Sequence, residues 1–325
     1  MKTLPLLLKR EYWEHRGGFL WTPLWVCAAI LIVTVLGIIS AEVFSASSHV
    51  QMGFALDDLR KNMSASDLAQ AGNALDMAQV MFGAITCISL FFVLFFYLLG
   101  ALYDDRRDRS VLFWKSLPVT DTATVASKVL TAMFVAPAIA FAISTVAYAA
   151  FLVLVCLWAA VHGVNALPAV FASHPLGMFG RLLLTIPIDA LWALPTIGWL
   201  LFWSATARSK PFLWAVILPI VVVALNGWFG VLGLPHVGGE IALKNVVGRL
   251  LLSIMPGSWL SADGMSFGGR RISFGMDDDH VLSTFDPSQV YALTATPGLW
   301  IGVVAGVALI VGAIWFRQRR IETSV

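Results

Sequence analysis

The chain has 325 residues, of which 59% are hydrophobic and only 12% carry a charge, whereas average soluble domains carry about 25% charged residues. Together with a mean hydropathy of +0.83, this composition excludes a water-soluble protein with one anchor and predicts an all-α polytopic membrane protein. The net charge of +2 is too small to indicate a nucleic-acid partner, which requires a strongly basic face. We therefore expect the lipid bilayer, and no nucleic acid, as the surroundings of this chain.

The first predicted span is 20–41. It follows the flank 1–19, which carries Lys2, Lys9, Arg10 and Arg16. The apolar run is longer than the 7–15 residues typical of a signal peptide. We therefore expect an uncleaved anchor.

Five further apolar stretches predict five more transmembrane helices, since a membrane helix needs about 20 mainly apolar residues. These predicted spans are 80–102, 128–160, 182–204, 211–234 and 297–316. The whole of 1–325 is therefore interpreted as one transmembrane domain with six spans.

Three longer segments separate the spans on the outer side of the predicted topology. Segment 43–79 has a helical, amphipathic pattern that favours an extension of the second span beyond the membrane. Segment 161–181 is rich in Gly, Pro, His and Asn, which is typical of a loop, and a helix lying on the membrane surface is the alternative within it. Within 235–296, the stretch 244–254 is either a re-entrant piece or an outer surface helix, and the sequence leaves both open.

The distribution of basic residues predicts that both termini are cytoplasmic. With that orientation the inner segments hold 14 of the 21 Lys and Arg residues, and the outer segments hold 7. An excess of Lys and Arg in cytoplasmic loops is the usual signature of orientation.

The predicted cytoplasmic loop 103–127 has an unusual mixture of charges. Residues 103–128 hold five basic and four acidic side chains. Anionic lipid attracts clusters of positive charge, so this mixture favours contact with a protein surface. The alternative is a solvated loop with ordinary interfacial anchors. Pro118 interrupts the segment, and Thr120 or Asp121 is suited to cap the helix that leads into the third span.

The sequence LYDDRRDRSVLFWKSLPVTDTATVASK resembles the first cytoplasmic loop of bacterial ABC-2-type transporter permeases. That family combines a tyrosine, an acidic and basic cluster, a hydrophobic turn, a Leu-Pro pair and a Lys at the head of the next span. The residues at those places are Tyr103, Asp104, Arg106, Arg107, Phe113, Trp114, Lys115, Leu117, Pro118 and Lys128. The flank LKREYWEHRGG is similar to the interfacial elbow helix of the same family.

The resemblance implies a permease subunit of an ATP-driven exporter in a bacterial inner membrane. It implies a second permease subunit, in a homodimer or a heterodimer, and a separate cytosolic ABC ATPase that holds ATP and Mg. It also implies a short cytoplasmic coupling helix between spans two and three, in a loop whose ATPase-coupling residues are Tyr103, Asp104, Asp105, Arg106, Arg107, Arg109, Phe113, Trp114, Lys115, Leu117 and Pro118.

The sequence contains no motif typical of nucleotide binding, metal binding or nucleophilic catalysis. It holds no GxxxxGKS or GxxxxGKT phosphate loop, no HExxH and no GxSxG. We therefore expect no catalytic, metal-binding or cofactor-binding residue, and the chain itself is not interpreted as an enzyme.

Asp189 is a carboxyl inside the fourth predicted span, where a charge is costly unless it is paired or hydrated. Helical spacing places polar and aromatic side chains on the same face: Thr185, Asp189, Trp192, Thr196 and Trp199. This face is a candidate transport path or subunit seam, and a structural seam around a protonated Asp is the competing interpretation. An ion-coupled secondary transporter using Asp189 is the alternative function, although the internal repeats typical of that class are missing from the sequence.

Overall fold

The computed structural model describes residues 3–48, 65–108, 119–259 and 287–322, and all regular structure in those ranges is helical. The helices are α1 (Thr3–Glu14), η1 (Gly17–Trp21), α2 (Thr22–Ser48), α4 (Ala65–Ala101), α5 (Tyr103–Arg107), α7 (Asp121–Leu130), η2 (Thr131–Val135), α8 (Ala136–Val161), α9 (Leu167–Ala172), α10 (Pro175–Thr206), α11 (Pro211–Val231), α12 (Gly239–Ala242), η3 (Leu243–Leu252), α15 (Pro287–Ala292), η5 (Leu293–Ala295) and α16 (Pro297–Glu322).

Six of these helical stretches are long and apolar enough to cross a membrane, which confirms the prediction of a multi-pass helical protein. They are between 21 and 42 residues long. Two of them extend well beyond the predicted spans, because the helices continue through polar residues at which the hydropathy pattern stops. The second runs over Ser66–Arg107 and the fourth over Leu167–Thr206. Most of segment 161–181, expected to be a loop, is helical, and Pro175 occupies the first turn of α10, where proline is well tolerated.

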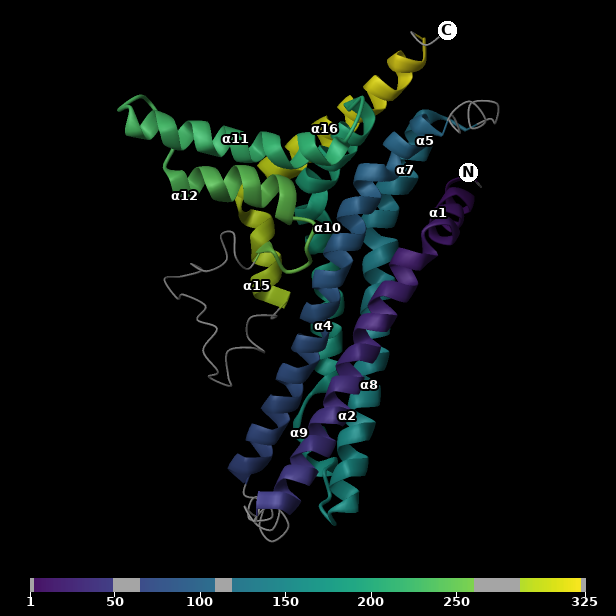
Figure 1. Cartoon of the computed structure of the whole chain (residues 1–325), viewed down its shortest axis with the longest axis vertical. Helices are drawn as coiled ribbons and strands as arrows, with labels where there is room; N and C mark the ends of the chain where they lie inside the picture. Colours follow the sequence, from purple (N-terminus) through teal and green to yellow (C-terminus); the bar gives the residue numbers. More distant parts are fainter. Residues whose placement is uncertain (1–2, 49–64, 109–118, 260–286, 323–325) are drawn as a thin grey trace.

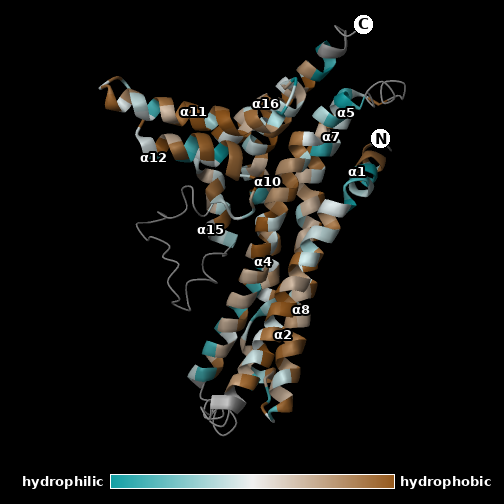
Figure 2. Cartoon of the chain, in the orientation of Figure 1, coloured by the Kyte–Doolittle hydropathy of each residue, from teal (hydrophilic) through white to brown (hydrophobic). Residues whose placement is uncertain are grey.

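Helices α2, α4, α8 and α10 lie along the long axis of the molecule (Figure 1). Helix α1, α5, the start of α7 and the end of α16 gather at one end, here called the termini end. The α9 helix, the start of α4 and the ends of α2 and α8 lie at the opposite end, here called the distal end. Hydrophilic residues concentrate toward these two ends, and hydrophobic residues dominate between them (Figure 2).

Helix α11 takes a different direction from the bundle. It lies across the long axis, and α12 with η3 returns beside it (Figure 1). The connection is fastened by Asn226, whose side chain donates to the Val237 carbonyl oxygen at 2.7 Å and accepts from its N–H at 2.9 Å. The stretch 244–254 therefore belongs largely to a helix that contacts both α10 and α11.

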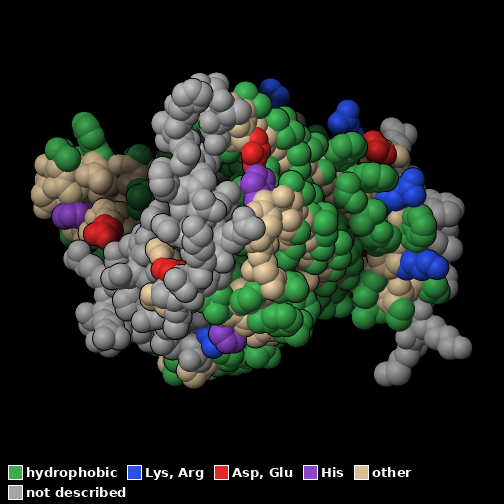
Figure 3. Space-filling model, turned by 90° about the horizontal axis from the view of Figure 1, so that it is seen from below, with side chains coloured by type: hydrophobic (Ala, Val, Ile, Leu, Met, Phe, Trp, Pro, Cys, Tyr) green, Lys and Arg blue, Asp and Glu red, His purple; other side chains and the backbone are tan. Residues whose placement is uncertain are grey.

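The tightest packing in the bundle joins α10 to α16. A Cβ atom at Gly306 would lie 2.5 Å from the backbone carbonyl of Leu194 and 2.8 Å from the backbone nitrogen of Pro195. Small residues at such crossings let membrane helices approach closely. Seen from below, most of the coloured outer surface of the bundle is hydrophobic (Figure 3), as expected of helices that face lipid.

Three side chains join α2 to α8 at the distal end. His162 Nε2 lies 3.0 Å from Glu42 Oε1, and Trp158 Nε1 donates to the same oxygen at 2.8 Å. The Trp158 carbonyl oxygen at the other ring nitrogen and the Glu42 carboxylate raise the pKa of His162 above its usual range, against a smaller opposing effect of burial. The protonated form of His162 therefore stabilises the contact with Glu42.

Candidate functional site

The turn between α4 and α5 is fastened to the end of α10. The backbone N–H groups of Leu102 and Tyr103 both donate to Ser204 Oγ, at 2.9 and 3.0 Å. Arg106 donates through Nη2 to the carbonyl oxygens of Ser204 at 2.6 Å and Ala207 at 3.1 Å. Because the last carbonyl groups of a helix have no partner within it, Arg106 acts as the C-terminal cap of α10.

Asp105 points in a different direction, toward α7 and α16. Its Oδ2 lies 3.3 Å from Arg317 Nη1 and 3.8 Å from Lys128 Nζ. Lys128 Nζ lies 3.3 Å from Glu11 Oε1 of α1. Arg317 also donates through Nε to Asp121 Oδ1 at 2.9 Å. We refer to Glu11, Asp105, Asp121, Lys128 and Arg317 together as the charge network.

The charge network is largely withdrawn from solvent. Glu11 is fully buried, and Lys128 and Arg317 are 2% and 4% exposed. Tyr97 of α4 adds a hydrogen bond from its hydroxyl to Glu11 Oε2 at 2.9 Å. Buried charges persist only when they are paired, and separating such a pair is costly. The network therefore connects α1, α5, α7 and α16 at the termini end, and Tyr97 joins α4 to it.

The structure gives the described residues of the predicted coupling loop two different roles. Asp105 and Arg106 face the protein interior through the contacts above, and Tyr103 is half-buried with the Arg106 guanidinium 5.9 Å from its ring. Asp104 and Arg107 are exposed, as is the following Asp108. The other predicted residues lie outside the described part of the chain: Arg109, Phe113, Trp114, Lys115, Leu117 and Pro118.

The expected cap of the following helix is confirmed. Thr120 Oγ1 accepts from the Ala123 N–H at 3.2 Å, and α7 begins at Asp121. This cap fixes the start of α7, so that Asp121 and Lys128 lie on the helix side of the loop. Glu11, Asp121 and Arg317 were missed as site residues, since their partners come from distant parts of the sequence.

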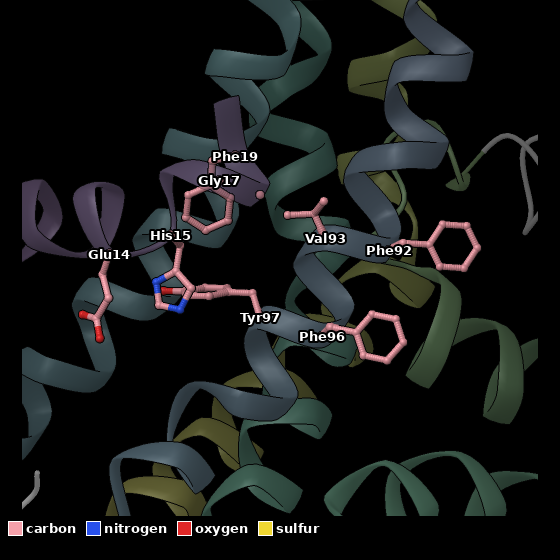
Figure 4. Close-up of a pocket in the computed structure, with 9 residues that line it drawn as sticks. Glu14, His15, Gly17, Phe19, Phe92, Val93, Phe96 and Tyr97 are labelled. Atoms are coloured by element: carbon pink, nitrogen blue, oxygen red, sulfur yellow. The ribbon is translucent and has the colours of Figure 1, made fainter. Parts of the chain in front are cut away.

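A groove of about 440 Å³ opens next to the network, between η1 and α4 (Figure 4). His15 packs edge-on against Tyr97, with ring centroids 4.7 Å apart. Gly18 lets η1 lie against α4, because a Cβ atom there would lie 2.9 Å from Val93 Cγ1. The groove combines apolar walls with three titratable groups, Glu14, His15 and Tyr97. Its other lining residues are Gly17, Gly18, Phe19, Phe92, Val93 and Phe96.

The polar face of α10 meets the segment that follows α11 in the same chain. Asp189 Oδ1 accepts from the Gly257 N–H and from Trp259 Nε1, both at 2.9 Å. This carboxyl thereby holds the turn after η3 against α10. Thr185, one turn earlier, donates from its hydroxyl to the Leu182 carbonyl oxygen at 2.8 Å.

The remaining members of that face make similar contacts. The Arg249 guanidinium lies 3.6 Å from the centre of the Trp192 ring, a cation–π distance. Thr196 Oγ1 donates to the Arg249 carbonyl oxygen at 3.0 Å, and Trp199 Nε1 donates to the carbonyl oxygen of Ala215 in α11 at 2.9 Å. The face selected from the sequence therefore forms an intramolecular seam with α11, η3 and the turn after it.

Among the described residues, no cluster of three or more His, Cys, Asp or Glu side chains is arranged to hold a metal ion. Comparison of the chain with protein-family models, curated proteins and solved structures gives no match.

Proposed function

We propose that this chain is the membrane-spanning permease subunit of an ATP-driven ABC transporter that exports its substrate across a bacterial inner membrane. A second permease subunit completes the translocation path, and a separate cytosolic ATPase holds ATP and Mg. The observation that supports this proposal is the charge network. Asp105, in the segment that resembles the coupling loop of ABC-2 permeases, is ion-paired to Arg317 and lies 3.8 Å from Lys128.

This arrangement is suited to transmit a movement. A partner that contacts the exposed side chains of Asp104, Arg107 and Asp108 would act on a short helix whose other side is fixed. Arg106 fixes it to α10, and Asp105 fixes it to α16. Because separating buried ion pairs is costly, displacement of α5 moves these helices with it.

The alternative, an ion-coupled secondary transporter, requires Asp189 to exchange an ion with a path through the protein. Two protein donors already occupy Asp189 Oδ1, and both belong to the turn after η3. This contact favours a structural role for Asp189 and supports the coupling proposal over the secondary transporter.

Charge reversal on the exposed face of α5 tests the proposal. The chain is co-expressed with a candidate cytosolic ABC ATPase from the same genome, and the permease is purified from membranes. Arg107→Glu combined with Asp108→Lys is expected to abolish ATPase co-purification and leave membrane insertion intact, because both side chains are exposed. Asp67→Lys, an exposed change at the distal end of α4, is the matched control and should keep the ATPase. Undiminished co-purification and ATPase stimulation by the double variant would overturn the coupling role.

A further inference from the structure

The turn between α9 and α10 lies directly on the distal part of α4. A Cβ atom at Gly72 would lie 2.9 Å from the backbone of both Ala172 and Ser173. The absence of a side chain at this position brings the polar groups of the turn within reach of α4.

Two side chains one helical turn apart on α4 hold this turn. Asp76 Oδ1 accepts from the His174 N–H at 3.3 Å, and Gln79 Nε2 donates to the Pro175 carbonyl oxygen at 3.4 Å. Asp76 is 2% exposed and Gln79 is 6% exposed. Both side chains therefore place polar atoms in a region that water does not reach freely.

The second oxygen of each side chain has no hydrogen-bond donor within the described part of the chain. These atoms, Asp76 Oδ2 and Gln79 Oε1, are both buried. An unpaired buried acceptor is costly. Rotating the Gln79 amide by half a turn does not solve this, because its oxygen would then face the Pro175 carbonyl oxygen. Asp76 and Gln79 are three positions apart and lie on the same side of α4. One hydrogen atom between the two oxygens would therefore satisfy both.

The titratable and charged groups facing Asp76 come from three elements. They are His174 of the turn, Arg181 of α10 and Tyr148 of α8. The Tyr148 hydroxyl donates to the Leu75 carbonyl oxygen at 3.0 Å, so its proton is already used. Burial and the two unpaired oxygens favour a neutral carboxyl group at Asp76, whereas the hydrogen bond from the His174 N–H and the positive charges of His174 and Arg181 favour a carboxylate.

We propose that Asp76 is a proton-binding site, in which a hydroxyl proton on Oδ2 is donated to Gln79 Oε1. The proton comes from water on the distal side and forms one O–H bond on the carboxylate. It completes the hydrogen bonds of both side chains, which then hold the α9–α10 turn on α4. Loss of the proton leaves a buried carboxylate with one backbone donor, so the turn separates from α4 more readily. This inference does not depend on the proposed function.

The test compares Asp76→Asn with the wild type, using the full chain purified in lipid nanodiscs. Asn keeps an acceptor for the His174 N–H and supplies an N–H donor for Gln79, without a titratable proton. Carboxyl groups of unfolded chains lose their protons near pH 4, so only the folded wild type holds this proton at higher pH. The folding equilibrium constant should therefore fall by up to about tenfold per pH unit as pH rises, until the folded chain also loses this proton.

The melting temperature of the wild type is thus expected to fall relative to that of Asp76→Asn between pH 5 and pH 8. Asp67→Asn, an exposed control on the same helix, should retain the wild-type pH dependence. In the infrared difference spectrum between wild type and Asp76→Asn, the carbonyl band of a protonated carboxylic acid should be lost.

Four results would overturn the proposal. The first is a difference in melting temperature between the wild type and Asp76→Asn that stays constant across this pH range. The second is a difference spectrum without the carboxylic acid band, and the third is an Asp76→Asn chain that does not fold. The fourth is stabilisation of the wild type, but not the variant, by Na⁺ at fixed pH, which would identify a metal cation as the occupant.

Discussion

Replacing Lys128 by Met removes the central cation of the charge network and keeps an apolar side chain of similar length. Lys128 is 2% exposed, and its Nζ lies 3.3 Å from Glu11 Oε1 and 3.8 Å from Asp105 Oδ2. In the variant, Asp105 keeps Arg317 as a partner, but among the described residues the Glu11 carboxylate keeps only the hydroxyl of Tyr97. Removing one member of a buried ion pair costs about 3–5 kcal/mol, and we expect a loss of this size.

The measurement is reversible unfolding in mixed micelles, with Lys9→Met as the exposed control. A double-mutant cycle with Glu11→Gln should show a coupling energy of about 1–3 kcal/mol, since the double variant leaves no unpaired charge at Glu11. Protease cleavage in α1, at Lys9 or Arg10, should accelerate in Lys128→Met because Glu11 no longer holds that helix. A loss below about 1 kcal/mol, as for exposed pairs, would refute the reasoning.

Three further changes test other contacts. His162→Gln should remove a stabilising contact that the wild type has near pH 6 and loses as pH rises above the raised pKa of His162. The melting temperatures of the two proteins should therefore converge at high pH, and a constant difference would contradict this. Gly306→Ala should cost about 1–3 kcal/mol by overpacking against α10, whereas Gly83→Ala, with open space around it, should cost nothing in the same unfolding experiment. Asp189→Leu leaves two donors without a partner, at about 1–3 kcal/mol each, and Asp189→Asn keeps an acceptor for them; equal stability of the two variants would argue against the seam.

The six apolar helices were predictable, because long uninterrupted apolar runs leave few other structures for a membrane-embedded chain. The cap at Thr120 was also predictable, since a hydroxyl residue before an apolar helix is a local signal. The ends of the helices were less predictable from the sequence. The α10 helix begins at Pro175, several residues before the apolar run, since its first turn is held by polar contacts to α4.

The charge network could not be derived from the sequence. Its members come from four parts of the chain, and the pairing of Asp105 with Arg317 joins residues 212 positions apart. Sequence pattern grouped Arg106 with the residues that meet a partner, but it cannot distinguish an exposed arginine from one that caps α10. The polar face of α10 was found from helical periodicity, whereas its partners Gly257 and Trp259 follow a segment whose direction the sequence leaves open.

The most direct test of the coupling proposal is a site-specific crosslink to the ATPase. Cys27, Cys87 and Cys156 are replaced by Ser, and Arg107→Cys is introduced on the exposed face of α5. The purified variant is then mixed with the candidate ATPase and a short crosslinker that joins the thiol at position 107 to an amine of the ATPase. We expect a permease–ATPase adduct at position 107 and none at an Asp67→Cys control, together with ATPase activity that rises when the permease is present. No adduct at position 107, with ATPase activity unchanged by the permease, would contradict the proposal.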